Sequence, residues 1–237
     1  MLVRVVAGQG QRGLRIQELT AASGLSATTV FRMVQGLIRE GVIERDARTH
    51  KLFLGRLVHE LGLAARQTPL HDLCRDTLHG VARDTGGVVY LSDRSGVEAV
   101  CVDRAVGESP EPHWPLDVGL RSPLGIGVGG LAILSALHDD TVLDVVHANS
   151  LRYRLCGGLT AAAVTRGVAE ARRRGYARRN SLMVPGAVAI GVPFRYGVSV
   201  GAMTVTTLRC HLDVRRSRRI VDTLMAAKDR LEAAQKD

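Results

Sequence analysis

The chain has 237 residues, 46% of them hydrophobic, 23% charged and 3% aromatic, and 32 Lys and Arg against 23 Asp and Glu give a net charge of +9. This apolar content excludes intrinsic disorder, the four scattered cysteines exclude a disulfide scaffold, and the longest apolar run, 124–137, is too short to cross a membrane. We therefore expect a small and a medium domain in a cytoplasmic protein without a signal peptide, and the basic balance weakly favours a nucleic-acid partner.

The first 41 residues predict a helix, a tight turn and a second helix. An apolar stripe that begins at Ile16 stops at Gly24, Ser26 is a good N-cap for the next helix, and Gly41 ends it. Spacing of i, i+3, i+4 and i+7 predicts that one face of the second helix is buried. That face consists of Val30, Met33, Val34 and Leu37.

Strand-like runs at 42–45 and 51–54 flank a polar tip at 46–50, which predicts a β-hairpin wing. A helix with an exposed polar face, packed on a shorter helix and followed by a basic wing, has the form that the major groove of DNA admits. The charge agrees, because residues 1–66 carry 10 basic and 5 acidic residues whereas 67–237 carry 22 and 18. A small helical domain with a solvated polar face is the alternative. The candidate DNA-binding residues are Ser26, Thr28, Thr29, Arg32 and Gln35 on the helix and Arg45, Arg48 and Lys51 on the wing.

Residues 56–67 again show helical spacing, with Leu57, Leu61 and Ala64 on one stripe, and Thr68-Pro69 ends the pattern. We assign 1–55 to a DNA-binding domain, 56–69 to a linker helix and 70–237 to a second domain. A narrow apolar seam beside a DNA-binding domain is suited to dimerisation. Packing of the stripe on its own domain explains the pattern equally well.

The second domain alternates helical and strand-like segments. Helices are predicted at 70–84, 130–147, 160–174 and 214–234, and strands at 88–91, 99–102, 188–194 and 199–206. Antiparallel hairpins mixed with helices predict an α+β domain with one sheet.

Two motifs in this domain match catalytic signatures, but their surroundings argue against both. Residues 125–130 satisfy G-x-G-x-x-G, yet they follow Pro123 rather than a clear strand and lie outside any βαβ unit. Residues 197–201 satisfy G-x-S-x-G, yet the chain continues as a strand after Ser199. The eight histidines form no H-x-x-x-H pair. We therefore expect no enzymatic activity, no cofactor and no metal.

Several separated segments carry one family pattern in a fixed order. Residues 19–26, 36–37, 40–41, 45–46 and 54–55 form its N-terminal part, and 119–124 with 130–132 form the entry to its second domain. Residues 174–177, 185–186, 193 and 201–205 follow its C-terminal part. In these segments the chain resembles the IclR family of transcriptional regulators. The resemblance implies an N-terminal winged helix-turn-helix domain joined by a linker helix to a GAF-like α/β sensor domain.

The resemblance also implies function. We expect a sequence-specific DNA-binding repressor that binds double-stranded DNA at a palindromic operator, as a homodimer or a dimer of dimers, and responds to a small organic effector such as an organic or aromatic acid. The implied effector-binding positions are Leu124, Gly125, Ile126, Gly127, Val128, Ser181, Ala189, Thr204 and Thr206.

This chain departs from the family pattern at the implied effector site. It has Gly125 and Gly127 where polar residues are usual, Ala189 in place of a cysteine, and the basic run 178–181 in place of acidic residues. These departures keep an alternative open: a ligand-independent DNA-binding or interaction protein with a vestigial effector domain.

Overall fold

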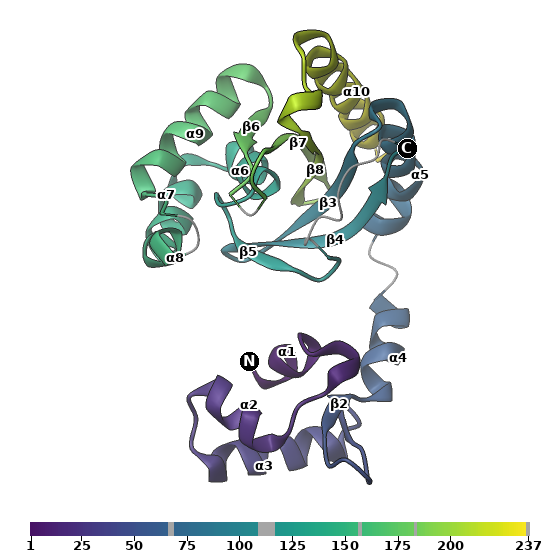
Figure 1. The fold of residues 1–237 in the computed structure, drawn as a ribbon, viewed down its shortest axis with the longest axis vertical. Helices are drawn as coiled ribbons and strands as arrows, with labels where there is room; N and C mark the ends of the chain where they lie inside the picture. The colour runs from purple at the N-terminus through teal and green to yellow at the C-terminus, as the bar shows by residue number, and fades with distance from the viewer. Residues whose placement is uncertain (66–68, 109–116, 156–157, 183, 236–237) are drawn as a thin grey trace. The chain divides into compact units, whose positions relative to one another are not determined.

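The computed structural model describes residues 1–65, 69–108, 117–155, 158–182 and 184–235 (Figure 1). The chain divides into two compact units, Met1–Pro69 and Leu70–Asp237. Each unit has its own buried apolar core. Among the described helices, none combines the length and the apolar character that a membrane span requires.

The N-terminal unit is a small helical domain with a two-stranded hairpin. Its elements are α1 (Leu2–Ala7), the 3₁₀ turn η1 (Gly10–Arg12), α2 (Ile16–Ser23), α3 (Ala27–Arg39), β1 (Ile43–Arg45), β2 (Leu52–Leu54) and α4 (Arg56–Ala65).

A glycine and a capping serine build the turn between α2 and α3. Gly24 ends α2 with φ +67°, a left-handed conformation that other residues rarely adopt. The Oγ of Ser26 accepts the N–H of Thr29 at 3.2 Å and so caps α3. The predicted helix, turn and helix are confirmed.

The core of this unit includes most, but not all, of the apolar stripe that was predicted on α3. Val30 and Val34 are fully buried, and Leu37 and Ile38 pack partly buried beside them. The prediction for Met33 is wrong, because this residue is 49% exposed. Met33 lies on the flank of the stripe, and Ile38 occupies the opposite flank instead. The buried core residues are Leu2, Val6, Leu14, Leu19, Val30, Val34, Ile43 and Leu52.

The predicted wing is confirmed as the antiparallel pair β1 and β2. Ile43 pairs with Leu54, and Leu52 also exchanges backbone hydrogen bonds with Leu14, which fastens the wing to the segment before α2. The chain then passes so close to the end of α3 that a Cβ on Gly55 would lie 2.2 Å from the carbonyl oxygen of Gly41. Only glycine fits at residue 55.

Helix α4 follows the wing directly. Leu57 and Val58 are half-buried, and the N–H of Leu57 donates to the carbonyl of Gly41 at 3.2 Å. Leu61, one turn further along, is 55% exposed. The side chain of Ala64 and the predicted continuation to Gln67 lie outside the described residues. The apolar stripe of α4 is therefore divided between contacts inside the unit and an exposed leucine.

The C-terminal unit contains one six-stranded sheet and its covering helices. Its elements are α5 (Pro69–Thr85), β3 (Val88–Ser95), β4 (Glu98–Val106), β5 (Arg121–Pro123), α6 (Val128–Ser135), α7 (Asp139–Ala148), α8 (Ser150–Leu155), α9 (Ala161–Arg174), β6 (Ala177–Asn180), β7 (Ala187–Tyr196), β8 (Ser199–Leu208), η2 (Arg209–His211) and α10 (Val214–Ala233). The strand order is β5-β4-β3-β8-β7-β6, with every neighbouring pair antiparallel.

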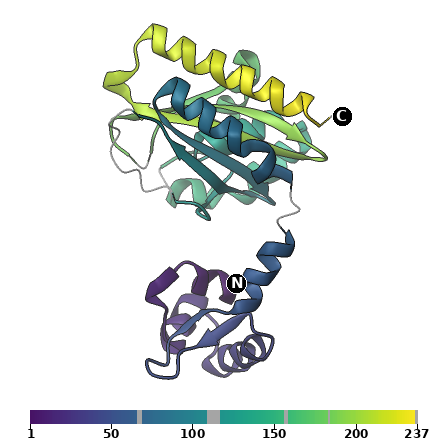
Figure 2. The ribbon, with the colours of Figure 1, turned by 90° about the vertical axis from the view of Figure 1, so that its right-hand side faces the viewer.

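Helices cover both faces of this sheet. Figure 2 shows α5 and α10 lying across one face, where they bury alternate residues of β3, β7 and β8 such as Leu91, Val192 and Met203. Helix α6 lies on the other face, and α9 packs on α6 and on the edge strand β6. The predicted fold class, α+β with a single sheet in the second domain, is confirmed.

The predicted helix over 130–147 is wrong, because the structure has two helices there. Helix α6 ends at Ser135, and His138 is an extended N-cap that starts α7, with Asp139 and Asp140 in its first turn. Carboxylates in that position favour a helix start, because the N-terminal end of a helix dipole is positive. Asp139 also pairs with Arg172 of α9. Helices α1 and α8 and strands β5 and β6 were not predicted.

Buried hydrogen bonds attach α8 to the segment before α6. The hydroxyl of Tyr153, fully buried, donates to the carbonyl of Leu124 at 2.7 Å.

We expect Tyr153→Phe to lower the free energy of unfolding by about 1–3 kcal/mol, because it leaves a buried carbonyl without its donor. Tyr176→Phe is the matched control, since the Tyr176 hydroxyl makes no hydrogen bond to the described residues. Urea denaturation measures both changes, and equal effects would contradict the assignment.

A cluster of two ion pairs joins β5 and α8 to β4. Glu98 accepts from Arg121 at 2.7 Å and from Arg152 at 2.6 Å, and only 18% of its side chain is exposed. The hydrogen bond from Arg152, followed by that from Arg121, lowers the pKa of the Glu98 carboxyl below its ordinary value against the opposing effect of burial. The cluster therefore links β4 to the edge strand β5 and to helix α8.

A lowered pKa in the folded state makes stability depend on pH. The stabilisation from Glu98 is complete above the ordinary carboxyl pKa, roughly above pH 5, and is lost as pH falls through the lower folded pKa. Glu98→Gln should therefore destabilise the protein near neutral pH and have a smaller effect as the solution becomes acidic. Thermal unfolding across pH tests this, with Glu60→Gln, at an exposed ion pair, as control. A deficit independent of pH would be inconsistent with the ion-pair role.

Candidate functional site

The outward face of α3 carries the residues predicted to contact DNA. Thr28, Thr29, Arg32 and Gln35 are all exposed, and Arg32 lies on the side opposite Val30 and Val34. No acidic residue occurs from Ala27 to Arg39. The Oγ of Ser26, besides capping the helix, shares a 2.8 Å hydrogen bond with the Thr29 hydroxyl. Two of the five predicted helix residues, Ser26 and Thr29, thus already have partners. The side chains of Thr28, Arg32 and Gln35 make no hydrogen bond or ion pair with the described residues.

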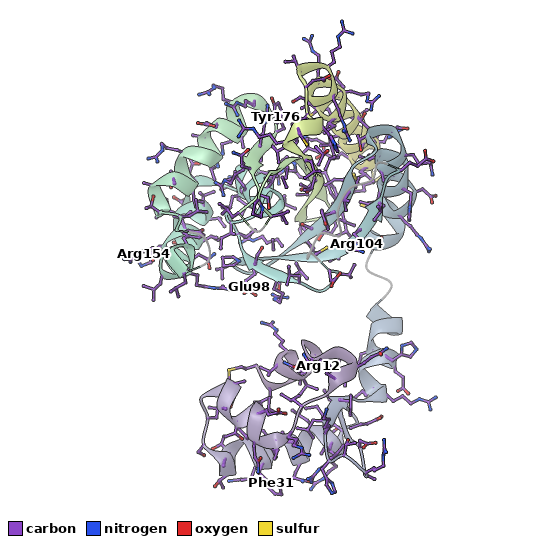
Figure 3. The ribbon with its side chains drawn as sticks, in the orientation of Figure 1. Arg12, Phe31, Glu98, Arg104, Arg154 and Tyr176 are labelled. Atoms are coloured by element: carbon purple, nitrogen blue, oxygen red, sulfur yellow. The ribbon has the colours of Figure 1, made fainter. Side chains whose placement is uncertain are left out.

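Two apolar side chains border this polar face. Phe31 is 51% exposed and Met33 49% exposed, and Figure 3 shows Phe31 at the outer surface of α3. Met33 was predicted to be buried, and no position was predicted for Phe31. Large apolar side chains beside a polar helix face can contact the methyl groups of thymine in the major groove. The exposed surface of α3 therefore carries both polar and apolar side chains.

The wing presents two exposed arginines, Arg45 and Arg48, and a lysine with a partner inside the unit. The ammonium of Lys51 donates to the carbonyl of Arg12 at 2.8 Å. At the tip, Asp46 accepts from the backbone N–H of Thr49 at 2.7 Å and from its hydroxyl at 2.6 Å. These bonds, the side-chain one first, lower the pKa of the Asp46 carboxyl. They fix the loop that holds Arg48.

A cavity of about 110 Å³ lies where the N-terminus of α6 meets the sheet. All six strands of the sheet, β3 to β8, and the first turn of α6 contribute to its wall. Its lining residues are Tyr90, Ser92, Ala99, Cys101, Leu120, Ser122, Ile126, Gly127, Val128, Gly129, Gly130, Arg179, Asn180, Ser181, Leu182, Val184, Ala189, Thr204 and Thr206.

The structure brings most of the implied effector positions to this cavity. The seven that line it are Ile126, Gly127, Val128, Ser181, Ala189, Thr204 and Thr206. Leu124 lies outside the lining because its side chain is fully buried in the core around Tyr153. Gly125 is also outside the lining, and its carbonyl accepts from Arg179.

Two hydroxyls in the cavity wall are buried without a hydrogen-bond partner among the described residues. They are the phenol of Tyr90, a residue 4% exposed, and the Oγ1 of Thr204, a residue 5% exposed. Burial raises the pKa of Tyr90 to about 12, so its hydroxyl stays protonated at neutral pH. An unsatisfied buried polar atom is costly, and a bound molecule with polar groups would satisfy both.

Tyr90 and Ser92 were not predicted as cavity residues, and Arg179 was noted only as part of the basic run 178–181, without a role of its own. The alternation of β3 places Tyr90 and Ser92 on the same face, and Tyr90 pairs with Thr204, which was an implied site residue. Strand pairing is not visible in a single sequence. Arg179 lay on a strand that was not predicted, and its neighbours Arg178 and Asn180 gave the segment the composition of a surface loop.

The glycines of the G-x-G-x-x-G segment have a packing role. A Cβ on Gly129 would lie 2.7 Å from the Oγ of Ser92, and one on Gly130 would lie 3.1 Å from the backbone nitrogen of Gly125. The segment does follow a strand, β5, but this strand is a short antiparallel edge strand and not part of a βαβ unit. Ser199 of the other motif is the first residue of β8 and pairs with Tyr196. It lies on a continuing strand.

Comparisons with known families match both units. The family described as bacterial transcriptional regulator IclR C-terminal matches residues 63–233, and the IclR helix-turn-helix domain matches residues 2–47. The HTH-type transcriptional regulator KipR of Bacillus subtilis (strain 168) is 31% identical over 125 residues, which are 52% of this chain and 49% of KipR. The matched part thus spans about half the length of this curated relative.

Solved structures share the whole fold. A putative IclR transcriptional regulator from Silicibacter sp. TM1040 has a TM-score of 0.81 at 24% identity, covering 93% of this chain and 88% of that one. An IclR homolog from Microbacterium hydrocarbonoxydans, complexed with 4-hydroxybenzoate, has a TM-score of 0.75 at 20% identity over 98% of each chain. With family models matched in both units, the chain belongs to the IclR family of bacterial transcriptional regulators.

Proposed function

We propose that this protein is a sequence-specific transcriptional repressor in the bacterial cytoplasm. It binds a palindromic operator through α3 and the wing, and a small organic effector in the C-terminal cavity changes its affinity for that operator. The observation that carries the proposal is the outward face of α3, which is polar, contains no acidic residue and points away from the core.

Each part of this surface has a chemical role in binding DNA. Arg32 projects opposite the buried stripe and has the forked donors that guanine accepts in the major groove. Thr28 and Gln35 lie beside it and offer hydrogen bonds to neighbouring base edges. Arg45 and Arg48 on the wing neutralise phosphates, which adds affinity without sequence information. Ser26, Thr29 and Lys51, which have internal partners, contribute mainly by fixing the helix and wing.

The cavity favours the hypothesis that the protein responds to an effector over the alternative that its second domain is vestigial. A cavity that had lost its ligand would be expected to fill with apolar side chains, yet here two buried hydroxyls line it without a partner in the part of the chain that the structure describes. The related protein from Microbacterium hydrocarbonoxydans carries 4-hydroxybenzoate. A ligand can change operator affinity only by as much as it favours one conformation of the protein over the other.

Two copies of the chain are proposed to pair through α4. Leu61 is exposed while Leu57, on the same stripe, packs on its own unit, so Leu61 offers an apolar contact to a second copy. The two DNA-binding domains of such a dimer match the two half-sites of a palindromic operator.

Arg32→Ala tests the role in base recognition. We expect it to weaken binding to a duplex enriched from a random pool by about 1–3 kcal/mol, with a much smaller loss on random-sequence DNA. Arg39→Ala is the matched control, because it removes the same charge from the far end of the same helix and should weaken both duplexes alike. Fluorescence anisotropy at fixed salt measures the four affinities. Equal losses from Arg32→Ala on both duplexes would refute a base contact.

Leu61→Glu tests the dimer contact. A carboxylate in an apolar seam should raise the dimer dissociation constant by roughly tenfold or more, because the charge must be desolvated or the seam opened. His59→Glu places the same charge on another side of α4 and should leave the dimer intact. Sedimentation equilibrium of the full chain distinguishes these outcomes. A fully dimeric Leu61→Glu protein would mean that the seam lies elsewhere.

A further inference from the structure

The positive charge of the C-terminal unit is concentrated in two segments. Residues 166–179 and 209–222 together contain 11 basic and 3 acidic residues, whereas the rest of 70–237 contains 11 basic and 15 acidic residues. A general preference for arginine in the sequence would spread the charge evenly. The two segments therefore form a positive region in a unit that is otherwise negative.

These segments are far apart in the sequence but adjacent in the fold. The first covers the C-terminal part of α9 and most of β6, and the second covers η2 and the N-terminal part of α10. A groove between α9 and β6 is lined by Arg166, Arg174 and Arg178. A groove between β6 and α10 is lined by Arg178 and Arg218. Arg178 thus borders both grooves, and so does Tyr176, which Figure 3 shows between α9 and α10.

Six arginines on these elements are exposed, and their side chains make no hydrogen bond or ion pair with the described residues. They are Arg166 and Arg173 on α9, Arg178 on β6, and Arg215, Arg218 and Arg219 on α10. We refer to these six residues as the α9–α10 surface.

The acidic residues of the two segments do not neutralise this surface. Glu170 lies 3.6 Å from Arg174, which is not one of the six. Asp213 is the N-cap of α10 and accepts the backbone N–H of Arg216 at 2.6 Å. Asp222 forms no ion pair with the described residues. The charge of the six arginines is therefore left to an external partner.

The arginines of α10 are placed where they lower the stability of the helix. Arg215, Arg218 and Arg219 lie in its first two turns, at the positive end of the helix dipole, and its first turn contains no acidic residue. Arg215 and Arg219 are also four residues apart, a spacing at which like charges repel on a helix. Arginines that oppose local stability, without a compensating contact in the fold, are typical of a binding site.

The arrangement of these charges fits an extended polyanion rather than a single small anion. Arg166 and Arg173 are seven residues apart on one side of α9, about 10 Å along the helix axis, and the other four arginines lie on two further elements. One phosphate or carboxylate cannot contact them all. Duplex DNA carries one negative charge per roughly 1.7 Å of its axis, and guanidinium groups bind phosphate oxygens through paired N–H donors. The chain belongs to a family with a DNA-binding domain, so a DNA duplex is a polyanion that it meets.

We propose that the α9–α10 surface is a second DNA-contact surface, which binds the phosphate backbone of a duplex without reading its sequence. Phosphate contacts add affinity but carry no sequence information. This contact is additional to those of α3 and the wing and requires neither an operator nor an effector. The C-terminal unit therefore contributes directly to the affinity for DNA.

The salt dependence of DNA binding by the full chain tests the proposal. The reference protein carries three substitutions that weaken the contacts of α3 and the wing: Arg32→Ala, Arg45→Gln and Arg48→Gln. Its ligand is a long duplex of random sequence, and fluorescence anisotropy measures its affinity over a range of salt concentrations. We expect this reference protein to retain binding that weakens steeply with salt.

Neutralising the α10 part of the surface in the reference protein should remove much of this salt dependence. The added substitutions are Arg215→Gln, Arg218→Gln and Arg219→Gln. The slope of log affinity against log salt concentration should become shallower by roughly 2 to 3, because each phosphate contact contributes about 0.9. An unchanged slope, or a reference protein that binds no DNA, would overturn the proposal.

A matched control removes the same charge from other exposed arginines of the unit. Its substitutions, on α5 and α8, are Arg75→Gln, Arg83→Gln and Arg154→Gln. They should leave the slope unchanged. A slope that falls equally in this control would show that net charge, and not the α9–α10 surface, is responsible, and the proposal would be wrong.

Urea denaturation distinguishes loss of a contact from loss of folding. Because the three α10 arginines oppose the dipole of their helix, replacing them with glutamine should leave the free energy of unfolding unchanged or raise it. A clear decrease would show that these arginines serve the fold, which contradicts a role in binding.

Competition with an acidic polypeptide tests the choice of DNA over an acidic protein. Poly-glutamate, matched to unlabelled duplex by total charge, should displace the labelled duplex from the reference protein much less effectively. Its charges are spaced roughly 3.3 Å apart in an extended chain, about twice the spacing along the duplex axis. Equal displacement by the two competitors would favour an acidic protein partner and overturn the assignment to DNA.

Sequence preference separates this proposal from the proposed function. In the otherwise wild-type chain, the three α10 substitutions should leave the ratio of affinities for enriched and random-sequence duplexes unchanged. A lower ratio would mean that these arginines read bases and would contradict the proposal. A chain that binds DNA through the α9–α10 surface but enriches no sequence would refute the proposed function and leave this inference standing.

Discussion

The close approach of α6 to the sheet is the constraint on which the C-terminal unit depends. Gly129 brings the helix within contact of Ser92, and on the facing strand a Cβ on Gly191 would lie 2.7 Å from the Oγ1 of Thr204. Side chains at these positions would push the helix off β3, β7 and β8. The close contact lies in the first turn of α6, and the cavity lies beside that turn.

This arrangement explains why polar atoms remain unsatisfied there. The residue of α6 that lies next to Thr204 is Gly129, which has no side chain to accept a hydrogen bond from the threonine. The N-cap of α6 is Gly127, so the helix also lacks a side-chain cap. The first N–H groups of a helix have no partner within it. The hydroxyls of Tyr90 and Thr204, which have no partner among the described residues, thus lie in the cavity wall beside the first turn of α6. A bound molecule with polar groups would satisfy these hydroxyls.

Sequence patterns were sufficient for features that depend on local geometry. The N-cap Ser26, the turn at Gly24 and the wing all followed from residues next to one another in the chain, and the structure confirms them. Met33 was misplaced because helical periodicity does not fix how wide a buried stripe is. The break between α6 and α7 was missed because the apolar run 130–137 continues past the end of the helix.

The cavity residues were only partly accessible to sequence reasoning, because they meet through strand pairing. Thr204 and Ala189 were identified by the resemblance, whereas Tyr90 becomes a site residue only when β3 is known to pair with β8. Arg179 belongs to a four-residue strand with three polar side chains, which has no strand pattern of its own. Its role depends on tertiary packing that covers it with α6 and α9.

The proposed function depends above all on recognition of a defined, symmetric DNA sequence by a pair of α3 helices. Selection of bound duplexes from a random pool by the full chain tests it most directly. We predict enrichment of an inverted repeat whose half-sites lie on one side of the duplex, separated by about 10 base pairs or a multiple of that spacing. A pool that shows no enriched sequence after repeated selection, or only an asymmetric one, would contradict it.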